Sequence, residues 1–349
     1  MVTERHVEAG EHSRGAELAP RNGRTVAVTG ASAGIGRAIA LKFAREGWHV
    51  ALIARSLGGI ESAKREIESA GGRAAAFPVD VSDADALFQA ADEIAQSWGG
   101  IDVWVNNAMV TMFAPLSEMS PKEFRRITEV DYLGYVHGTM AALKHMRSRD
   151  SGTIIQIGSA LSYRAIPLQS AYCGAKFAIR AFTDSLRSEL IHGGSRIRLS
   201  MMQLPAVNTP QFDWARNRFP RRPRPLPPVF QPEAIADRVY RAALAPPREL
   251  WLGFPTLKAI AGAIALPGFL DRYLARNAYD GQFTSEPAPI DAADNLFEPA
   301  NVGHVARGRF NERARTRVTP LNPWAIRAFA ALASLSLLAA LAVLVWLAV

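Results

Sequence analysis

The 349-residue sequence predicts an α/β fold: a doubly wound parallel sheet of about seven strands with helices on both faces. Three observations support this prediction. Short runs rich in Val, Ile and Ala alternate with longer amphipathic stretches over residues 24–253. The apolar runs are almost continuous, which is typical of strands that are buried on both faces of a sheet. A glycine-rich turn follows the first run, where a strand must turn tightly into a helix.

The elements follow one another in a regular order along this region. The expected strands cover 24–30, 49–55, 73–81, 102–108, 152–159, 196–204 and 248–253. The expected helices cover 34–46, 56–70, 83–98, 121–147, 168–192 and 232–245. Ser120 and Pro121 favour the start of the fourth helix, as its cap and first residue. Because the strands are parallel, we expect ligands to bind at their carboxyl ends.

The two ends of the chain differ from the middle. Residues 1–22 are polar and charged, and we interpret them as a flexible N-terminal arm rather than a signal peptide. From Ala328 to the C-terminus there is no charge and no proline, and about 20 apolar residues can span a hydrocarbon core of about 30 Å. We therefore expect a transmembrane helix at 324–349. The arginines upstream of it would place the domain on the cytoplasmic side of the membrane.

Three further stretches interrupt the alternation. Residues 205–231 are proline-rich and basic, and we expect a long surface loop. Residues 254–280 begin with an apolar run that is broken by prolines. Three interpretations of residues 254–280 remain: a substrate lid, a membrane-contacting segment or a core helix. Residues 281–323 are expected to form an irregular linker to the anchor, so the catalytic domain would cover 23–253.

The first motif is TGASAGIG, residues 29–36, between the first strand and the first helix. Gly30, Gly34 and Gly36 allow the backbone to turn tightly and to approach a pyrophosphate, which then lies at the N-terminus of the helix. A glycine-rich turn alone is weak evidence, but the required strand and helix are both predicted here. The motif therefore predicts a Rossmann-type dinucleotide site.

The end of the second strand indicates which dinucleotide is bound. Sites that select NAD place an acidic residue there, on the 2′-hydroxyl of the ribose. This chain has Ala54 at that position, followed by Arg55, whose charge and forked donors suit a 2′-phosphate. We therefore expect NADP(H) to be preferred over NAD(H). The alternative is that Arg55 is a surface arginine at the start of a helix.

The helix expected at 168–192 carries Tyr172 and Lys176 four positions apart, and hence on one face. Taken alone, such a pair is more often an aromatic and a charge on an amphipathic helix. Ser159 at the end of the preceding strand changes this balance, because the carboxyl ends of parallel strands meet at one edge of the sheet. The three residues together indicate a catalytic site.

These motifs resemble the short-chain dehydrogenase/reductase family, in its shorter single-domain, NADP-preferring branch, over residues 24–253. The family has a TGxxxGxG turn, an acid and a hydrophobic residue after the third strand, an Asn-Asn-Ala segment after the fourth, and a serine before a YxxxK helix. The resemblance implies that the cofactor is bound by Gly30, Ser32, Ala33, Gly34, Ile35, Gly36, Arg55, Asp80, Val81, Asn107, Ala108, Tyr172, Lys176, Pro205, Val207 and Thr209. It implies catalytic roles for Ser159, Tyr172, Lys176 and Asp131.

The expected reaction interconverts a carbonyl and an alcohol by hydride transfer. A tyrosine has an ordinary pKa of about 10, which is too high for a base near neutrality. The ammonium of Lys176 favours the phenolate, so we expect Tyr172 to act as general acid and base. Ser159 is expected to hydrogen-bond the substrate oxygen. The alternative for Ser159 is a strand-end serine that caps the following turn.

Three residues depart from the family pattern. Asp131 stands where an asparagine usually relays protons through water to the lysine. An aspartate could hold that water, but its charge would stabilise the ammonium and alter the relay. Met109 and Ala206 stand where glycines are usual. These departures keep open an alternative function, a catalytically weak or inactive NADP-binding membrane scaffold or sensor.

Composition argues against several other classes of protein. The only cysteine, Cys173, allows no intramolecular disulfide and has no paired base in the sequence. The histidines and acids have no zinc-type spacing, so no metal is expected. The net charge of +8 could indicate nucleic acid, but no nucleic-acid-binding motif supports this. The glycine spacing also disfavours a sugar-nucleotide epimerase.

The leading hypothesis is a membrane-anchored NADP(H)-dependent oxidoreductase, of ketoreductase type. The apolar stretch 254–270 and the anchor suggest a lipophilic substrate, such as a steroid, retinoid or acyl molecule taken from the lipid bilayer. The expected partners are thus this substrate and the bilayer, with no nucleic acid. The sequence leaves a homo-oligomer open.

Overall fold

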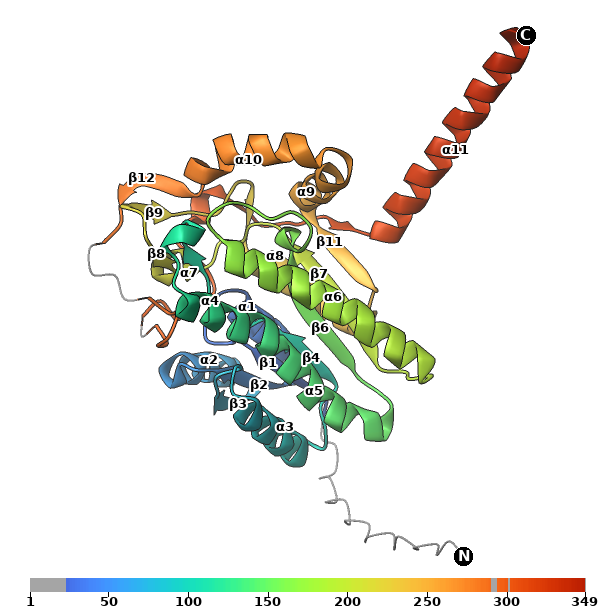
Figure 1. Cartoon of the computed structure of the whole chain (residues 1–349). Helices are drawn as coiled ribbons and strands as arrows, with labels where there is room; N and C mark the ends of the chain where they lie inside the picture. The colour runs from blue at the N-terminus through green and yellow to red at the C-terminus, as the bar shows by residue number, and fades with distance from the viewer. Residues whose placement is uncertain (1–22, 290–293, 301, 349) are drawn as a thin grey trace, which may run out of the picture.

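An eight-stranded sheet forms the centre of the fold, in the order β14-β11-β7-β6-β4-β1-β2-β3 (Figure 1). The computed structural model describes residues 23–289, 294–300 and 302–348, so the expected arm at 1–22 lies outside the described residues. The strands of the sheet are β1 (Thr25–Thr29), β2 (His49–Ala54), β3 (Arg73–Pro78), β4 (Val103–Asn106), β6 (Thr153–Ser159), β7 (Arg198–Leu204), β11 (Glu249–Leu252) and β14 (Pro320–Leu321). The seven expected strands are confirmed, and all of them pair in parallel.

The order of the strands reverses at the centre of the sheet. β1 pairs with β2 on one side and with β4 on the other. The chain therefore runs outward from β1 to β3, crosses back to β4, and continues in the other direction to β11. In open parallel sheets, a crevice forms at such a reversal, outside the carboxyl ends of the strands.

Helices cover both faces of the sheet, as a doubly wound fold requires (Figure 1). One face is covered by α1 (Gly34–Arg45), α2 (Leu57–Ser69) and α8 (Pro232–Leu244). Apolar side chains such as Phe43, Ile60 and Val239 form the core on this face. The other face is covered by α3 (Ala84–Trp98), α4 (Pro121–Thr128), α5 (Gly134–Met146) and α6 (Ser170–His192). Leu87, Leu143 and Leu186 belong to the core on that face.

The long helix expected at 121–147 is interrupted. It begins at Pro121 with a capping box in which Ser120 accepts from the Glu123 backbone N–H, which confirms the expected start. A π-helical turn, Glu129–Leu133, then separates α4 from α5. Such turns are frequent at functional sites, and this one contains Asp131.

The proline-rich stretch 205–231 and the stretch 281–323 are more ordered than expected. Together they contain the short helix α7 (Gln211–Trp214) and the strands β8 (Arg216–Asn217), β9 (Arg221–Pro223), β10 (Val229–Phe230), β12 (Phe283–Pro287), β13 (Ala314–Arg315) and β14. β12 pairs with β9, β13 pairs with β10, and β8 pairs with β5 (Met112–Phe113). The stretch expected to be an irregular linker therefore packs on the domain and adds an edge strand to its main sheet.

Residues 254–280 fall within two consecutive helices, α9 (Gly253–Ala265) and α10 (Pro267–Gly281). Pro267 begins the second helix, as prolines commonly do at a first helical position. Figure 1 shows both helices above the carboxyl ends of the central strands. Their outer side chains, including Ile264 and Phe269, are exposed.

The C-terminal helix α11 (Pro323–Ala348) projects away from the rest of the fold (Figure 1). No helix formed by the described residues is long and apolar enough to cross a membrane. This finding overturns the expected transmembrane helix at 324–349 and, with it, the expected membrane localisation with a cytoplasmic domain. The expectation rested on apolar length, whereas α11 carries the charged Arg327 in its first turns, and a charged side chain is costly in the hydrocarbon core. Side chains at 330, 333, 337–339 and 341–349 lie outside the description.

Candidate active site

A cavity of about 1060 Å³ lies at the carboxyl ends of the central strands, where the reversal of strand order predicts a crevice. All but two of the predicted site residues line it: Gly30, Ser32, Ala33, Gly34, Ile35, Arg55, Asp80, Val81, Asn107, Ala108, Ser159, Tyr172, Lys176, Pro205, Val207 and Thr209. Gly36 and Asp131 are buried outside this lining. The fold therefore brings the predicted residues to one place, although they are spread over six strand ends and helix α6.

The glycine-rich turn has the backbone that its sequence predicts. Gly30 and Gly34 have φ values of +68° and +58°, which side chains rarely allow. A Cβ on Gly36 would lie 2.2 Å from the Gly30 carbonyl oxygen, so only glycine fits there. Helix α1 begins at Gly34 without a side-chain cap, which leaves donors of its first turn for an anion. This arrangement fits the pyrophosphate of a dinucleotide.

The end of β4 is tied to the end of β1 beside this turn. The Asn107 side chain donates to the Thr29 carbonyl at 2.9 Å, and the Asn107 backbone N–H donates to the Thr29 hydroxyl at 2.9 Å. A Cβ on Gly30 would meet the Ala108 Cα at 2.8 Å. The two strand ends are thus packed backbone to backbone at the reversal point.

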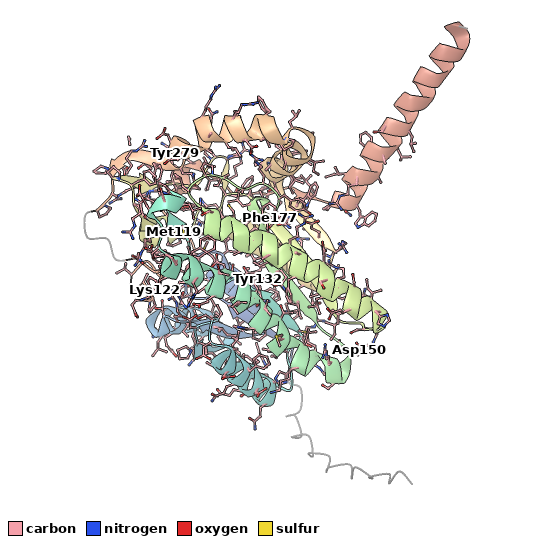
Figure 2. The ribbon with its side chains drawn as sticks, viewed as in Figure 1. Met119, Lys122, Tyr132, Asp150, Phe177 and Tyr279 are labelled. Carbon is pink, nitrogen blue, oxygen red and sulfur yellow. The ribbon has the colours of Figure 1, made fainter. Side chains whose placement is uncertain are left out.

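Lys176 is buried beside Tyr172 on α6. Its Nζ donates to the Tyr135 hydroxyl and to the Ile157 carbonyl, both at 3.0 Å, and lies 5.5 Å from the centre of the Tyr172 ring. The next residue, Phe177, faces outward from the same helix and is 40% exposed (Figure 2). Tyr172 and Lys176 therefore occupy the inner face of α6, as their spacing predicts.

Sequence reasoning missed Tyr135, which orients the lysine. Its hydroxyl donates to the Ile157 carbonyl at 3.0 Å and accepts from Lys176. A signal was available, because Tyr135 follows Asp131 by four positions in the expected helix and so shares its face. The π-helical turn between them does not remove this proximity: the Asp131 charge raises the pKa of Tyr135 further above its ordinary value, after the larger effect of burial.

Ser159 stands at the end of β6 and makes two kinds of contact. Burial raises the pKa of Tyr172 well above its ordinary value, and a hydrogen bond with Ser159 opposes this rise. The Ser159 hydroxyl also accepts from the Leu161 N–H at 3.1 Å, at the start of a 3₁₀ turn, Ala160–Ser162. The alternative role as a cap is thus present as well. The two contacts are compatible because a hydroxyl both donates and accepts.

Asp131 lies behind Lys176, fully buried. Its Oδ1 accepts from the Val110 N–H at 2.8 Å, and its Oδ2 is buried with no hydrogen-bond partner among the described residues. Burial raises the pKa of Asp131 to about 7, and the charge of Lys176 opposes that rise. Burial lowers the pKa of Lys176 to about 8, and the charge of Asp131 opposes that fall. Each residue of this pair therefore favours the charged form of the other.

Arg55 lines the opposite end of the cavity, which we call the adenosine end. Its guanidinium donates to the Phe297 carbonyl at 2.7 Å and to the Asn295 carbonyl at 2.5 Å. Arg126 of α4 donates to Asp80 and, at 3.0 Å, to the Leu296 carbonyl. We call residues 294–308, apart from residue 301, the C-terminal strap. Sequence reasoning missed these contacts, because local patterns give no signal for pairs about 240 positions apart.

The substrate end of the cavity is mainly apolar. Helices α9 and α10 contribute Phe254, Leu270, Tyr273 and Leu274, and the stretch 205–231 contributes Phe212, Trp214 and five prolines. Leu270 and Leu274 are one helical turn apart and so share one face of α10. Residues 254–280 thus form one wall of the cavity that Tyr172 faces.

The family model for short chain dehydrogenases matches residues 24–218, more than half of the chain. A fatty acyl-CoA reductase from Acinetobacter baylyi is 32% identical over 70% of this chain and 80% of its own length. A 3β-hydroxysteroid dehydrogenase from Eggerthella lenta is 35% identical over 71% of this chain and 96% of its own length.

Solved structures agree with these matches. The crystal structure of a metagenomic short-chain oxidoreductase in complex with NADP is 29% identical, with a TM-score of 0.55, over 64% of this chain and 91% of the other. The strand order, the cavity and the sequence matches lead to the same conclusion. The chain belongs to the short-chain dehydrogenase/reductase family and is an NAD(P)-dependent oxidoreductase that acts on alcohol or carbonyl groups.

Proposed function

We propose that the protein is an NADP(H)-dependent oxidoreductase that interconverts a lipophilic ketone and its alcohol, with Tyr172 as general acid and base. The observation that carries this proposal is the position of Lys176. Its ammonium is buried, held by Tyr135 and the Ile157 carbonyl, and lies 5.5 Å from the Tyr172 ring. A positive charge held there stabilises the phenolate that forms when Tyr172 gives up its proton.

A bound nicotinamide dinucleotide would supply or accept the hydride. In the reductive direction the Tyr172 hydroxyl gives its proton to the substrate oxygen, and in the oxidative direction the phenolate takes it back. Burial raises the pKa of Tyr172, which keeps the hydroxyl protonated and suits the role of acid. Ser159 positions the substrate oxygen through its hydroxyl. Asp131 favours the charged form of Lys176, whereas its own charge raises the pKa of Tyr172 and opposes the phenolate directly.

The preference for NADP(H) rests on the end of β2. Ala54 leaves no carboxylate for a ribose 2′-hydroxyl, and Arg55 lines the cavity beside it. The bonds of Arg55 to the Phe297 and Asn295 carbonyls use two of its five N–H donors. The remaining donors are available to a 2′-phosphate. The related metagenomic oxidoreductase was crystallised in complex with NADP, which supports the same preference.

The lipophilic substrate class rests on the walls of the substrate end. Phe254, Leu270 and Leu274 of α9 and α10 face the cavity, which makes residues 254–280 a substrate lid. The names of two relatives, a fatty acyl-CoA reductase and a 3β-hydroxysteroid dehydrogenase, support an apolar substrate. The reaction needs only a carbonyl or hydroxyl carbon within reach of Tyr172.

The test is NADPH oxidation with a panel of lipophilic ketones, for the wild type and Tyr172→Phe. Loss of the proton donor should reduce turnover by about 10²- to 10⁴-fold and leave NADPH binding, followed by its fluorescence, unchanged. Tyr132→Phe is the matched control, because Tyr132 packs against Phe182 and does not line the cavity. Turnover that survives Tyr172→Phe would contradict the assigned acid. NADPH binding without turnover of any ketone would favour the scaffold function instead.

A further inference from the structure

The C-terminal strap lies against the glycine-rich turn itself. The Gly34 N–H, one of the donors at the start of α1, donates to the Val305 carbonyl at 3.0 Å. The buried guanidinium of Arg37 in the same helix donates to the His304 carbonyl at 2.6 Å. Together with the Arg55 bonds to the Asn295 and Phe297 carbonyls, these contacts hold the strap at the adenosine end through its backbone.

The His304 side chain points from the strap into the space between α2 and the glycine-rich turn. Its Nε2 lies 3.3 Å from the Ser56 hydroxyl. A Cβ on Gly59 would lie 2.7 Å from both the His304 Nδ1 and the Ser32 Cβ, so the imidazole fills a space that only glycine leaves open. The side-chain directions thus place His304 beside Ser32 and Ser56, and all three residues line the cavity.

His304 also has an unused polar atom. Its Nδ1 is buried, with no hydrogen-bond partner in the part of the chain that the structure describes. An orphaned buried nitrogen is costly and commonly marks a place where a ligand binds. Burial lowers the pKa of His304 and the charge of Arg37 lowers it further, so the ring is neutral and offers one donor and one acceptor.

The charges around His304 suit an anion. Arg55 contributes a guanidinium with unused donors at the same end of the cavity. Two carboxylates act on Arg55: Asp80, which is engaged by Ser82 and Arg126, and Glu298 of the strap. A dianion placed between Arg55 and His304 would meet donors from both residues, against the charges of Asp80 and Glu298.

We propose that the C-terminal strap is part of the dinucleotide site, and that His304 is a specificity-determining residue that binds the 2′-phosphate of NADP(H) together with Arg55 and Ser56. This inference rests on the proposed preference for NADP(H). His304 would thus add a phosphate-binding side chain from the C-terminal strap, whereas the residues that the family pattern assigns to the cofactor lie within 30–209. The strap would also have to be in place for full discrimination between the two dinucleotides.

The experiment compares two small ligands and two isosteric variants of the full chain. Adenosine 2′,5′-bisphosphate carries the distinguishing phosphate, and 5′-AMP lacks it. Dissociation constants for both are measured by isothermal titration calorimetry, without any substrate. His304→Gln keeps a neutral donor, whereas His304→Glu places a negative charge of the same size and shape there. The glutamate variant should bind the bisphosphate at least about tenfold more weakly than the glutamine variant does, with 5′-AMP changing less than about twofold.

The controls separate this inference from the proposed function. Val302→Ala changes an exposed side chain of the strap and should alter neither constant. If the glutamate and glutamine variants discriminate equally, or lose both ligands equally, His304 has no role at the 2′-phosphate and the inference is wrong. If the wild type binds the two ligands equally, the proposed preference for NADP(H) fails first, and this inference fails with it.

Discussion

The two ends of the cavity are built in different ways. At the catalytic end, charged and polar groups of α5, α6 and the π-helical turn face one another inside the core, and Lys176 donates to the Tyr135 hydroxyl and the Ile157 carbonyl. At the adenosine end, Arg55 and Arg126 donate to backbone carbonyls of the C-terminal strap. The first end is held by buried charges that influence one another. The second is held by backbone contacts between distant parts of the chain.

This difference predicts different responses to change. Buried charges interact strongly because the local dielectric is low, so the catalytic end should respond to pH through Asp131 and Lys176. Guanidinium groups stay charged at all ordinary pH values, so Arg55 should not titrate. Changes at the adenosine end should therefore appear in cofactor affinity, and changes at the catalytic end in turnover and in the pH dependence of stability.

The largest effect is expected for Asp131→Asn on the pH dependence of stability. The folded state raises the pKa of Asp131 from 3.8 to about 7, so it binds this proton more tightly than the unfolded chain does. Its contribution to stability is therefore present at low pH and is lost as pH rises from about 4 to about 7. The wild-type free energy of unfolding should fall by about 1–2 kcal/mol more than that of the variant between about pH 5 and about pH 7. Chemical denaturation at both pH values measures this.

Lys176 and a control carboxylate sharpen this prediction. Lys176, with a pKa of about 8, stays protonated over this window in the wild type, so it does not mask the slope. In the Asp131→Asn variant the pKa of Lys176 should fall, which makes stability rise with pH.

Asp92 is a control carboxylate. It is half-exposed, and hydrogen bonds from Lys144 and His145 outweigh the effect of burial and lower the pKa of Asp92. Asp92→Asn should therefore leave the slope between about pH 5 and about pH 7 nearly unchanged, because this carboxyl is ionised in both the folded and the unfolded chain there. Parallel slopes for wild type and Asp131→Asn would mean that folding does not raise the pKa of Asp131.

The same contrast explains what the sequence could predict. The glycine-rich turn, Ser159 and the pair of Tyr172 and Lys176 are specified locally, by spacing and by position after a strand. The parallel topology then brings those strand ends to one edge, which makes the core and the catalytic end predictable. The roles given to these residues remain predictions that the comparisons do not test.

The adenosine end and the C-terminal part were not predictable in this way. The strap has no periodic pattern of apolar residues. Its contacts with Arg55 join positions about 240 apart, so local sequence patterns do not predict them. The edge strand β14 has only two residues, Pro320 and Leu321, and a proline disfavours a strand except at an edge. The expected membrane helix shows the opposite error, because apolar length alone was taken as sufficient.

An effect of comparable size is expected for Arg55→Ala on cofactor preference. Removing the guanidinium should weaken NADPH binding by about ten- to hundredfold, because charge-assisted hydrogen bonds contribute about 1.5–3 kcal/mol each. NADH binding should change by less than about threefold. Fluorescence titration with both dinucleotides measures the ratio. Arg45→Ala removes an equal charge from the far, exposed end of α1 and serves as the control.

Arg55 also contacts the strap, which makes a second outcome informative. Loss of its bonds to the Asn295 and Phe297 carbonyls could loosen the strap and weaken both dinucleotides alike. An equal loss for NADPH and NADH would therefore assign Arg55 a structural role and remove the main support for the proposed preference. A selective loss would show that the adenosine end discriminates by charge.

The smallest effect is expected at the substrate end of the cavity, whose walls come from α9, α10 and the stretch 205–231. Leu274 of α10 is partly buried and lines the cavity. Leu274→Asn removes apolar surface worth about 1 kcal/mol, so the KM for a lipophilic ketone should rise about fivefold. The KM for a short ketone and the affinity for NADPH should stay within about twofold. Leu266→Asn changes a more exposed leucine outside the cavity lining and is the matched control. An equal rise in KM for short and lipophilic ketones would mean that α10 does not sort substrates by their apolar surface.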